Sequence, residues 1–502
     1  MPTYTFPYSG RTITWAGGSG AYGPGPDGVL LIQAGTAPVT IQSTTPDWDD
    51  TTGYHGACLG MPGNRERHQY GFDRRLSMTG VRTACPFVIP LGEAAVLVES
   101  KPADEMSSGT WTPTGYSSTN SRSIIKFMDA VCVVAWDPTD AASTSLTPPL
   151  LGTNDVSKGF RLTNIGNLGI PQSMLDYSKL PSVVDLSAIA TALSVDVTVF
   201  DTLKTNLETL FANFMGDIYS GWSTDTSTPG MQHPGYGTYL AGAVSQALVL
   251  LASDRYDTEA KTPLARSLAQ AGLHLTGAMF DGRQMIANGG HCQGRKALIA
   301  FFGWLSGISE FEFMSDFFKS VGGTSPFRED VCYRDTTWWS GASSSDRWLA
   351  GWAYNSTGTA NSNGDALQNA PSTWGDVDTW GSWASLMQAY MPPTVGADIG
   401  TALFFALVGS PRAWSEGGVR MCAQWMASSV TSLPVHTDMA AIGLDFSATG
   451  PAWGEDYSVS PNVPGLQAQA WLAHYADAIA AYGDGAPGLP VGLDDSVEPS
   501  MP

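Results

Sequence analysis

Apolar and polar positions change their spacing about a third of the way along the chain. Up to about residue 150, short runs of β-branched and aromatic residues are separated by clusters of Gly, Pro, Asn and Asp, which is the pattern of short strands. The strands predicted in this way are Arg11–Trp15, Val29–Ala34, Val39–Gln42, Phe87–Val88, Ala94–Val98 and Ser123–Trp136. Because no helical period lies between them, we expect an antiparallel β-sandwich-like module over residues 1–155.

From about residue 185 the apolar positions recur at steps of three and four, which marks one face of a helix. The first such set is Phe200, Leu203, Leu207, Leu210, Phe214 and Ile218. A second helix is expected to start at Thr262 and Pro263, as an N-cap followed by a proline at the first helical position. Further helices are predicted over residues 236–254, 294–309, 310–320, 380–391, 397–409, 414–429 and 464–482.

Several of these helices are apolar on more than one side, which predicts burial between neighbouring helices. Residues 297–305 (ALIAFFGWL) and 401–409 (TALFFALVG) are the clearest cases. No fixed repeat period is present, so the pattern favours an (α/α) toroid of helical hairpins over residues 185–483. We therefore predict an α+β multidomain protein, with a linker over 156–184 and a tail over 484–502.

The composition narrows the classes of partner. Charged residues make up only 14% of the chain and the formal net charge is −21, which argues against nucleic acid and against anionic membrane surfaces. No apolar run reaches the length that spans a bilayer, so no membrane insertion is expected. The N-terminus lacks the pattern of a secretory signal, while low charge and abundant Gly, Ser and Thr suit an extracellular or virion-associated protein, with a homo-oligomer or virion subunits as candidate partners.

Metal and cofactor motifs are not found in the sequence. The six cysteines are scattered without a CxxC pair, no HExxH spacing occurs, and the glycine-rich stretch at residues 17–25 lacks the Lys-Ser/Thr of a phosphate loop. We therefore predict no catalytic metal and no cofactor.

The segment 287–296 (ANGGHCQGRK) is the richest in candidate chemistry. His291 precedes an apolar helix, where the helix dipole disfavours protonation of the imidazole. Asn288 and Arg295 accompany it, and a neutral base beside an amide and a guanidinium suits removal of a proton next to a carboxylate. The structural alternative is that Asn288 caps the helix and His291 is a satisfied structural residue.

A second polar segment opens a helix at residues 233–239 (HPGYGTY). His233 and Tyr236 are candidates for base and acid at this junction of loop and helix. Pro-Gly-Tyr-Gly is also ordinary turn chemistry, with a tyrosine packed on top of the turn.

A third segment combines carboxylates with tryptophans. Glu329 and Asp335 are candidates for the paired carboxylates of a glycoside hydrolase. Ten of the 17 tryptophans lie between residues 338 and 453, where loop tryptophans can stack on sugar rings. The candidate stacking residues are Trp338, Trp339, Trp348, Trp352 and Trp380, and the alternative is that they plug helix ends.

The densest charge cluster, residues 64–75, contains Arg67 and Arg74. These side chains are candidates for contacting a substrate, with a solvated loop or an interdomain contact as the alternative.

In architecture the chain resembles the (α/α)-toroid polysaccharide lyases and related glycoside hydrolases, although their β-part commonly follows the helices. In those lyases an Asn, a His, a Tyr and an Arg neutralise a uronate and move its proton. The resemblance implies these roles for Asn288, His291, Tyr236 and Arg295, with His233 as a substitute base.

The sequence thus favours an enzyme that cleaves a carbohydrate polymer by β-elimination at a uronate. A glycoside hydrolase that uses paired carboxylates is the first alternative. A non-catalytic glycan-binding phage virion or surface protein is the second alternative.

Overall fold

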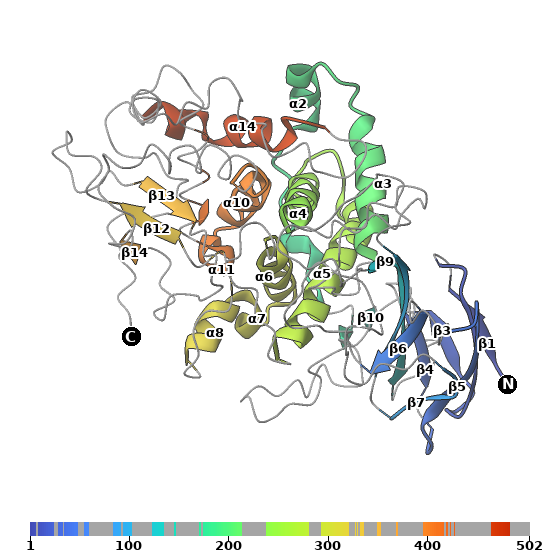
Figure 1. Cartoon of the computed structure of the whole chain (residues 1–502). Coiled ribbons are helices and arrows are strands. Elements are labelled where there is room, and N and C mark those ends of the chain that lie inside the picture. Colours follow the sequence, from blue (N-terminus) through green and yellow to red (C-terminus); the bar gives the residue numbers. More distant parts are fainter. Residues whose placement is uncertain are drawn as a thin grey trace.

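The chain contains both helices and sheets, as a computed structural model shows (Figure 1). The structure describes residues 1–6, 9–24, 29–33, 35–48, 55–59, 84–91, 94–102, 123–134, 145–146, 170–171, 174–212, 237–280, 293–320, 327, 329, 332–335, 349–352, 368–369, 395–415, 418–419, 422, 426 and 463–481. Among these, two N-terminal sheets lie on one side of the helices and a small three-stranded sheet lies on the other (Figure 1).

The first N-terminal sheet is antiparallel throughout. Its order is β1 (Thr3–Thr5), β2 (Thr12–Ala16), β5 (Val39–Thr45) and β7 (Phe87–Ile89). Ile13 and Trp15 are buried, while the residues that alternate with them in β2 are only partly buried. This period of two is the signal that predicted the strand from the sequence.

The second sheet is mixed, which corrects the expectation of a purely antiparallel module. Its order is β3 (Tyr22–Pro24), β4 (Leu30–Gln33), β9 (Ser123–Val134), β8 (Ala94–Pro102) and β6 (His55–Leu59). β4 pairs with β9 in parallel, with Leu30 opposite Val131. Both strands are continuous apolar runs in this region, which is typical of strands buried on two faces.

The two N-terminal sheets share one hydrophobic core. Ile13, Trp15 and Ile41 from the first sheet belong to the same buried cluster as Ile32 and Val133 from the second. Burial of these side chains holds the two sheets together.

The helices pack around α4 and share a second, larger core. They are α2 (Leu186–Leu193), α3 (Val199–Ala212), α4 (Gly237–Leu251), α5 (Thr258–Phe280), α6 (Arg295–Ser306), α7 (Ser309–Glu312), α8 (Met314–Ser320), α10 (Ile399–Leu407), α11 (Pro411–Trp414) and α14 (Leu466–Ala481). Helix α4 contacts α3, α5, α6, α10 and α14, and every residue from Leu240 to Leu251 is buried. A helix that is apolar all round is expected at such a central place.

The start of α5 corrects the expected cap at Thr262 and Pro263. The helix begins at Thr258, and Pro263 lies inside it. Asp257 caps it instead, because its Oδ1 accepts a hydrogen bond from the backbone N–H of Ala260 at 2.8 Å. The sequence interpretation placed the cap five residues too late because it gave the proline more weight than the aspartate.

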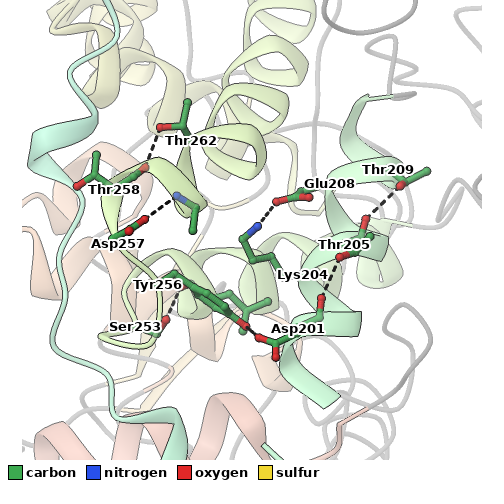
Figure 2. A network of polar contacts seen from close by, with 12 residues as sticks. Asp201, Lys204, Thr205, Glu208, Thr209, Ser253, Tyr256, Asp257, Thr258 and Thr262 are labelled. Carbon is green, nitrogen blue, oxygen red and sulfur yellow. Dashed lines mark hydrogen bonds and ion pairs between the residues drawn. The ribbon is translucent and has the colours of Figure 1, made fainter. Parts of the chain in front are cut away.

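The turn between α4 and α5 is tied to α3 by polar contacts (Figure 2). Asp201 of α3 accepts hydrogen bonds from Nε of Arg255 at 2.9 Å and from Oη of Tyr256 at 2.8 Å. Lys204, one turn further on, pairs with Glu208 and lies over the ring of Tyr256. These contacts fix the register of α3 against the α4–α5 hairpin.

The small sheet and several short elements were not predicted. β12 (Cys332–Asp335) lies between β13 (Leu349–Trp352) and β14 (Gln368–Asn369). Nearer the N-terminus, β10 (Ser145–Leu146) pairs with β11 (Ile170–Pro171), and a 3-10 turn, η6, follows at Tyr177–Lys179. Leu175 is buried in the helical core, so part of the predicted linker packs against the helices, as does Leu146 from the predicted β-module.

Candidate functional site

The described polar residues with candidate chemistry gather in the interior at the N-terminal end of α6. Five of them are exposed by no more than 2%: Gln293, Arg295, Lys296, Glu329 and Asp398. We call this set the α6 junction. Charged side chains are rarely buried to this extent unless they are paired, so the junction requires a specific arrangement of partners.

Gly294 forms the entry to α6. Its φ of 84° lies in the left-handed region, and an added Cβ would come within 2.7 Å of backbone atoms of Ala241 in α4. Only glycine combines this conformation with so close an approach to another helix. The glycine at position 294 is therefore a packing requirement at this point.

Glu329 caps α6 from a distant part of the chain. Its Oε1 accepts a hydrogen bond from the backbone N–H of Gly294 at 3.1 Å. Its own carbonyl oxygen accepts a hydrogen bond from Oγ of Ser415 at 2.6 Å, which fixes the backbone that carries the carboxylate. A carboxylate is stabilised at this end of a helix because the macrodipole is positive there.

Gln293 is held on two sides. Its Nε2 donates to Oδ2 of Asp398 at 2.7 Å, and its carbonyl oxygen accepts a long hydrogen bond from Nη1 of Arg295 at 3.4 Å. Together with the Glu329 contact, these interactions fix two consecutive residues immediately before the helix.

The charges of the junction balance. Arg295 and Lys296 are two cations, and Glu329 and Asp398 are two carboxylates, so the formal sum is zero. Nζ of Lys296 also lies 5.5 Å from the centre of the Phe327 ring. A balanced set of this kind is the form in which ionic groups are tolerated in a protein interior.

The other end of α6 has the complementary charge. Lys179 donates from Nζ to the carbonyl oxygen of Trp304 at 3.0 Å, in the last turn of the helix. Gly307 then ends α6 with a φ of 70°. A carboxylate at the N-terminus and a lysine at the C-terminus both stabilise the helix dipole.

Three residues of the α6 junction, Gln293, Lys296 and Asp398, were not among the predicted site residues. Gln293 lies inside the segment that was singled out, yet an uncharged amide carried no chemical signal of its own. Asp398 directly precedes the apolar helix α10, and an aspartate at that position is a recognisable N-cap signal. The pairing of Gln293 with Asp398 joins positions 105 apart in the sequence, which no local pattern predicts.

The structure brings together two of the predicted site segments, since Arg295 and Glu329 both belong to the α6 junction. Asp335 lies in β12 and Trp352 in the neighbouring strand β13, where Asp335 is opposite Leu349 and Trp352 is opposite Cys332. The other candidates lie outside the described residues: Asn288, His291, His233, Tyr236, Trp338, Trp339, Trp348, Trp380, Arg67 and Arg74.

Two features, a membrane-spanning helix and a metal-binding cluster, are not found among the described residues. No helix in this part of the chain is long and apolar enough to cross a membrane. Over the same residues, no group of three or more His, Cys, Asp and Glu side chains is placed to hold a metal ion. Comparisons of the chain with protein-family models, with curated proteins and with solved structures found no match.

Proposed function

We propose that the chain is a carbohydrate-active enzyme that cleaves a polysaccharide by β-elimination at a uronate. The observation that carries the proposal is the 3.1 Å hydrogen bond from Gly294 to Glu329. It joins the segment that carries Asn288, His291 and Arg295 to the carboxylate segment 35 residues further along the chain. One candidate residue from each segment, Arg295 and Glu329, therefore belongs to the α6 junction.

The proposed chemistry needs a base and an acid at that place. His291 removes the proton from the carbon next to the uronate carboxylate, and the electron pair of that C–H bond forms a double bond as the glycosidic oxygen leaves. Tyr236 supplies a proton to the departing oxygen, with His233 as the substitute base. Asn288 donates a hydrogen bond to the carboxylate, which takes up negative charge as the proton is removed.

Chain connectivity supports a common location for His291 and the α6 junction. Three residues of extended chain span no more than about 11 Å, and His291 precedes Gly294 by three positions.

Arg295 and Glu329 enter the proposal as residues that hold this region in place. Arg295 is only 1% exposed and Glu329 is fully buried, so neither side chain is open to a polymer in this structure. Their charges belong to a fixed electrostatic background in the interior, where such charges act more strongly than in water.

The proposal also includes a β-sandwich, an (α/α) toroid and a location outside the cell or on a virion. The core shared by the two N-terminal sheets supports a sandwich-like module, and the packing of five helices around α4 is compatible with a toroid. An extracellular or virion-associated setting and self-association are part of the same proposal, and the low charge and the abundance of Gly, Ser and Thr support the setting.

A glycoside hydrolase that uses Asp335 is the second candidate. Asp335 lies in β12, next to the strand β13 that carries Trp352. A hydrolase needs a pair of carboxylates, and in this strand pair Asp335 and Trp352 lie at opposite ends of the ladder. In this case Asp335 rather than the buried Glu329 is the carboxylate that acts on the sugar.

The products of polymer cleavage separate the candidates. The chain is incubated with a panel of polyuronates and neutral polysaccharides, and both ultraviolet absorbance and reducing ends are followed. Elimination yields both signals because each cleavage creates an unsaturated sugar, whereas hydrolysis yields reducing ends alone. Binding without either signal identifies a non-catalytic glycan-binding protein and overturns the proposal.

A further inference from the structure

Helix α10 begins at an aspartate that does not cap it. Asp398 occupies the N-cap position, yet its side chain makes no capping hydrogen bond to its own helix. The N–H of Gly400 donates instead to Oε1 of Gln467 in α14 at 3.0 Å, and the N–H of Thr401 donates to Oγ of Ser245 in α4 at 3.1 Å. Two neighbouring helices therefore take over the task that an N-cap aspartate usually performs.

The Asp398 carboxylate is directed to Gln293 in the α6 junction. The distance from Nε2 of Gln293 to Oδ2 of Asp398 is 2.7 Å, which is a direct hydrogen bond. Both residues are fully buried, so water does not compete for this contact. The bond joins the start of α10 to the residue before Gly294.

We infer that Asp398 is a positioning residue, which fixes Gln293 and thereby the path of the backbone into α6. This inference rests on the proposed function, because it assigns the fixed backbone a task in holding the base-bearing segment. Glu329 fixes the next residue, Gly294, from another side. Two buried carboxylates from separate parts of the chain thus hold two consecutive residues.

The contacts of Ser245 allow the positioning of Gln293 by Asp398 to be tested separately from the stability of α10. Ser245 accepts from Thr401 and also donates to the carbonyl oxygen of Ala397 at 2.6 Å, so it secures α10 without contacting Gln293. Loss of Ser245 weakens the start of α10, while loss of Asp398 removes the link to Gln293. Ser245→Ala is therefore the matched control for Asp398→Ala.

The test compares Asp398→Ala, Asp398→Asn and Ser245→Ala in the full chain. Hydrogen–deuterium exchange is read at the amides of residues 293–297, and kcat and KM are measured on the polymer that the wild type cleaves. We expect exchange there to rise at least tenfold in Asp398→Ala and to stay within threefold of wild type in Ser245→Ala. Asp398→Asn, which keeps an acceptor oxygen, should recover most of the protection.

Catalysis gives a second readout. Asp398→Ala should lower kcat at least tenfold with KM changed less than threefold, while Ser245→Ala should leave both within twofold. If Asp398→Ala does not fold, Gln293→Met replaces it, because methionine has nearly the same shape and lacks the N–H donor. Unchanged exchange in the variant, or an equal rise in Ser245→Ala, overturns the inference.

The hydrogen–deuterium exchange measurement tests the role of Asp398 even if the wild type shows no activity. A wild-type chain that cleaves no polymer overturns the proposed function. The difference in exchange between Asp398→Ala and Ser245→Ala then still shows whether Asp398 fixes the entry to α6.

Discussion

The backbone N–H of Gly294 lies 3.1 Å from Oε1 of Glu329, and the acceptor is fully buried. This contact places a negative charge at the positive end of α6, in an environment where water does not screen it. It is also the point at which two segments with candidate chemistry meet. The stability of α6 and the proposed site therefore depend on the same hydrogen bond.

Replacement of Glu329 should reveal this dependence. Glu329→Ala removes the acceptor of the Gly294 N–H and one of the two buried carboxylates of the α6 junction, and should lower the free energy of unfolding by about 3–5 kcal/mol. Glu329→Gln keeps an acceptor oxygen and should cost about 1–3 kcal/mol. Urea denaturation measures both, with Glu310→Gln, at an exposed position, as a control expected within about 0.5 kcal/mol of wild type. Equal costs for the alanine and glutamine variants would contradict a role for the hydrogen bond.

Two glycines of α6 make a matched pair. Gly294 and Gly307 both have a positive φ, but an added Cβ at Gly294 overlaps Ala241, whereas at Gly307 its nearest neighbour is Nζ of Lys179 at 3.9 Å. Gly307→Ala should cost about 1–2 kcal/mol, from the left-handed backbone alone. Gly294→Ala should cost about 1–3 kcal/mol more, since the overlap with α4 adds to the strain. Thermal or urea unfolding of the two variants checks the difference, and equal losses would show that α4 yields to the added methyl group.

The contacts of Asp201 predict a dependence of stability on acid. Hydrogen bonds from Arg255 and Tyr256 hold the pKa of the Asp201 carboxyl below its usual value (Figure 2). A carboxyl with a lowered pKa in the folded state contributes stability that is present above its unfolded pKa of about 3.9 and lost as pH falls through the folded value. The contribution should be under about 1 kcal/mol because the pair is partly exposed.

Asp201→Asn tests this sign. The free energy of unfolding should differ between wild type and variant at pH 6, and the difference should shrink as the pH is lowered towards 3. Asp254→Asn, at a nearby exposed carboxylate, is the control and should show no such change. A difference that stays constant or grows on acidification would contradict the role assigned to Asp201.

Helices could be predicted from the sequence where apolar residues recur at helical spacing. Leu203, Leu207 and Leu210 recur at helical spacing and are buried as expected in α3. The small sheet was not foreseeable in the same way, since β12, β13 and β14 are two to four residues long and are paired across 13 to 32 intervening residues. Their pairing depends on tertiary contacts rather than on a local period.

The candidate site was foreseeable in part for a similar reason. Glycine followed by two basic residues before an apolar run marked the entry to α6 at Gly294 and Arg295. Glu329 and Asp398, which accept hydrogen bonds from Gly294 and Gln293, come from distant segments of the chain. Buried polar groups need such partners, but a local pattern does not identify them. Local sequence shows neither that Arg295 and Lys296 are buried nor which of the 46 acidic residues lie near them.

The most direct test of the proposed elimination is the ultraviolet absorbance produced when wild type and His291→Ala act on a polyuronate. The account predicts a steady rise for the wild type and a rate at least a hundredfold lower for His291→Ala. His55→Ala, in the strand β6 of the N-terminal sheets, should keep the wild-type rate. No rise with any polyuronate for the wild type, or an undiminished rate in His291→Ala, would contradict the account.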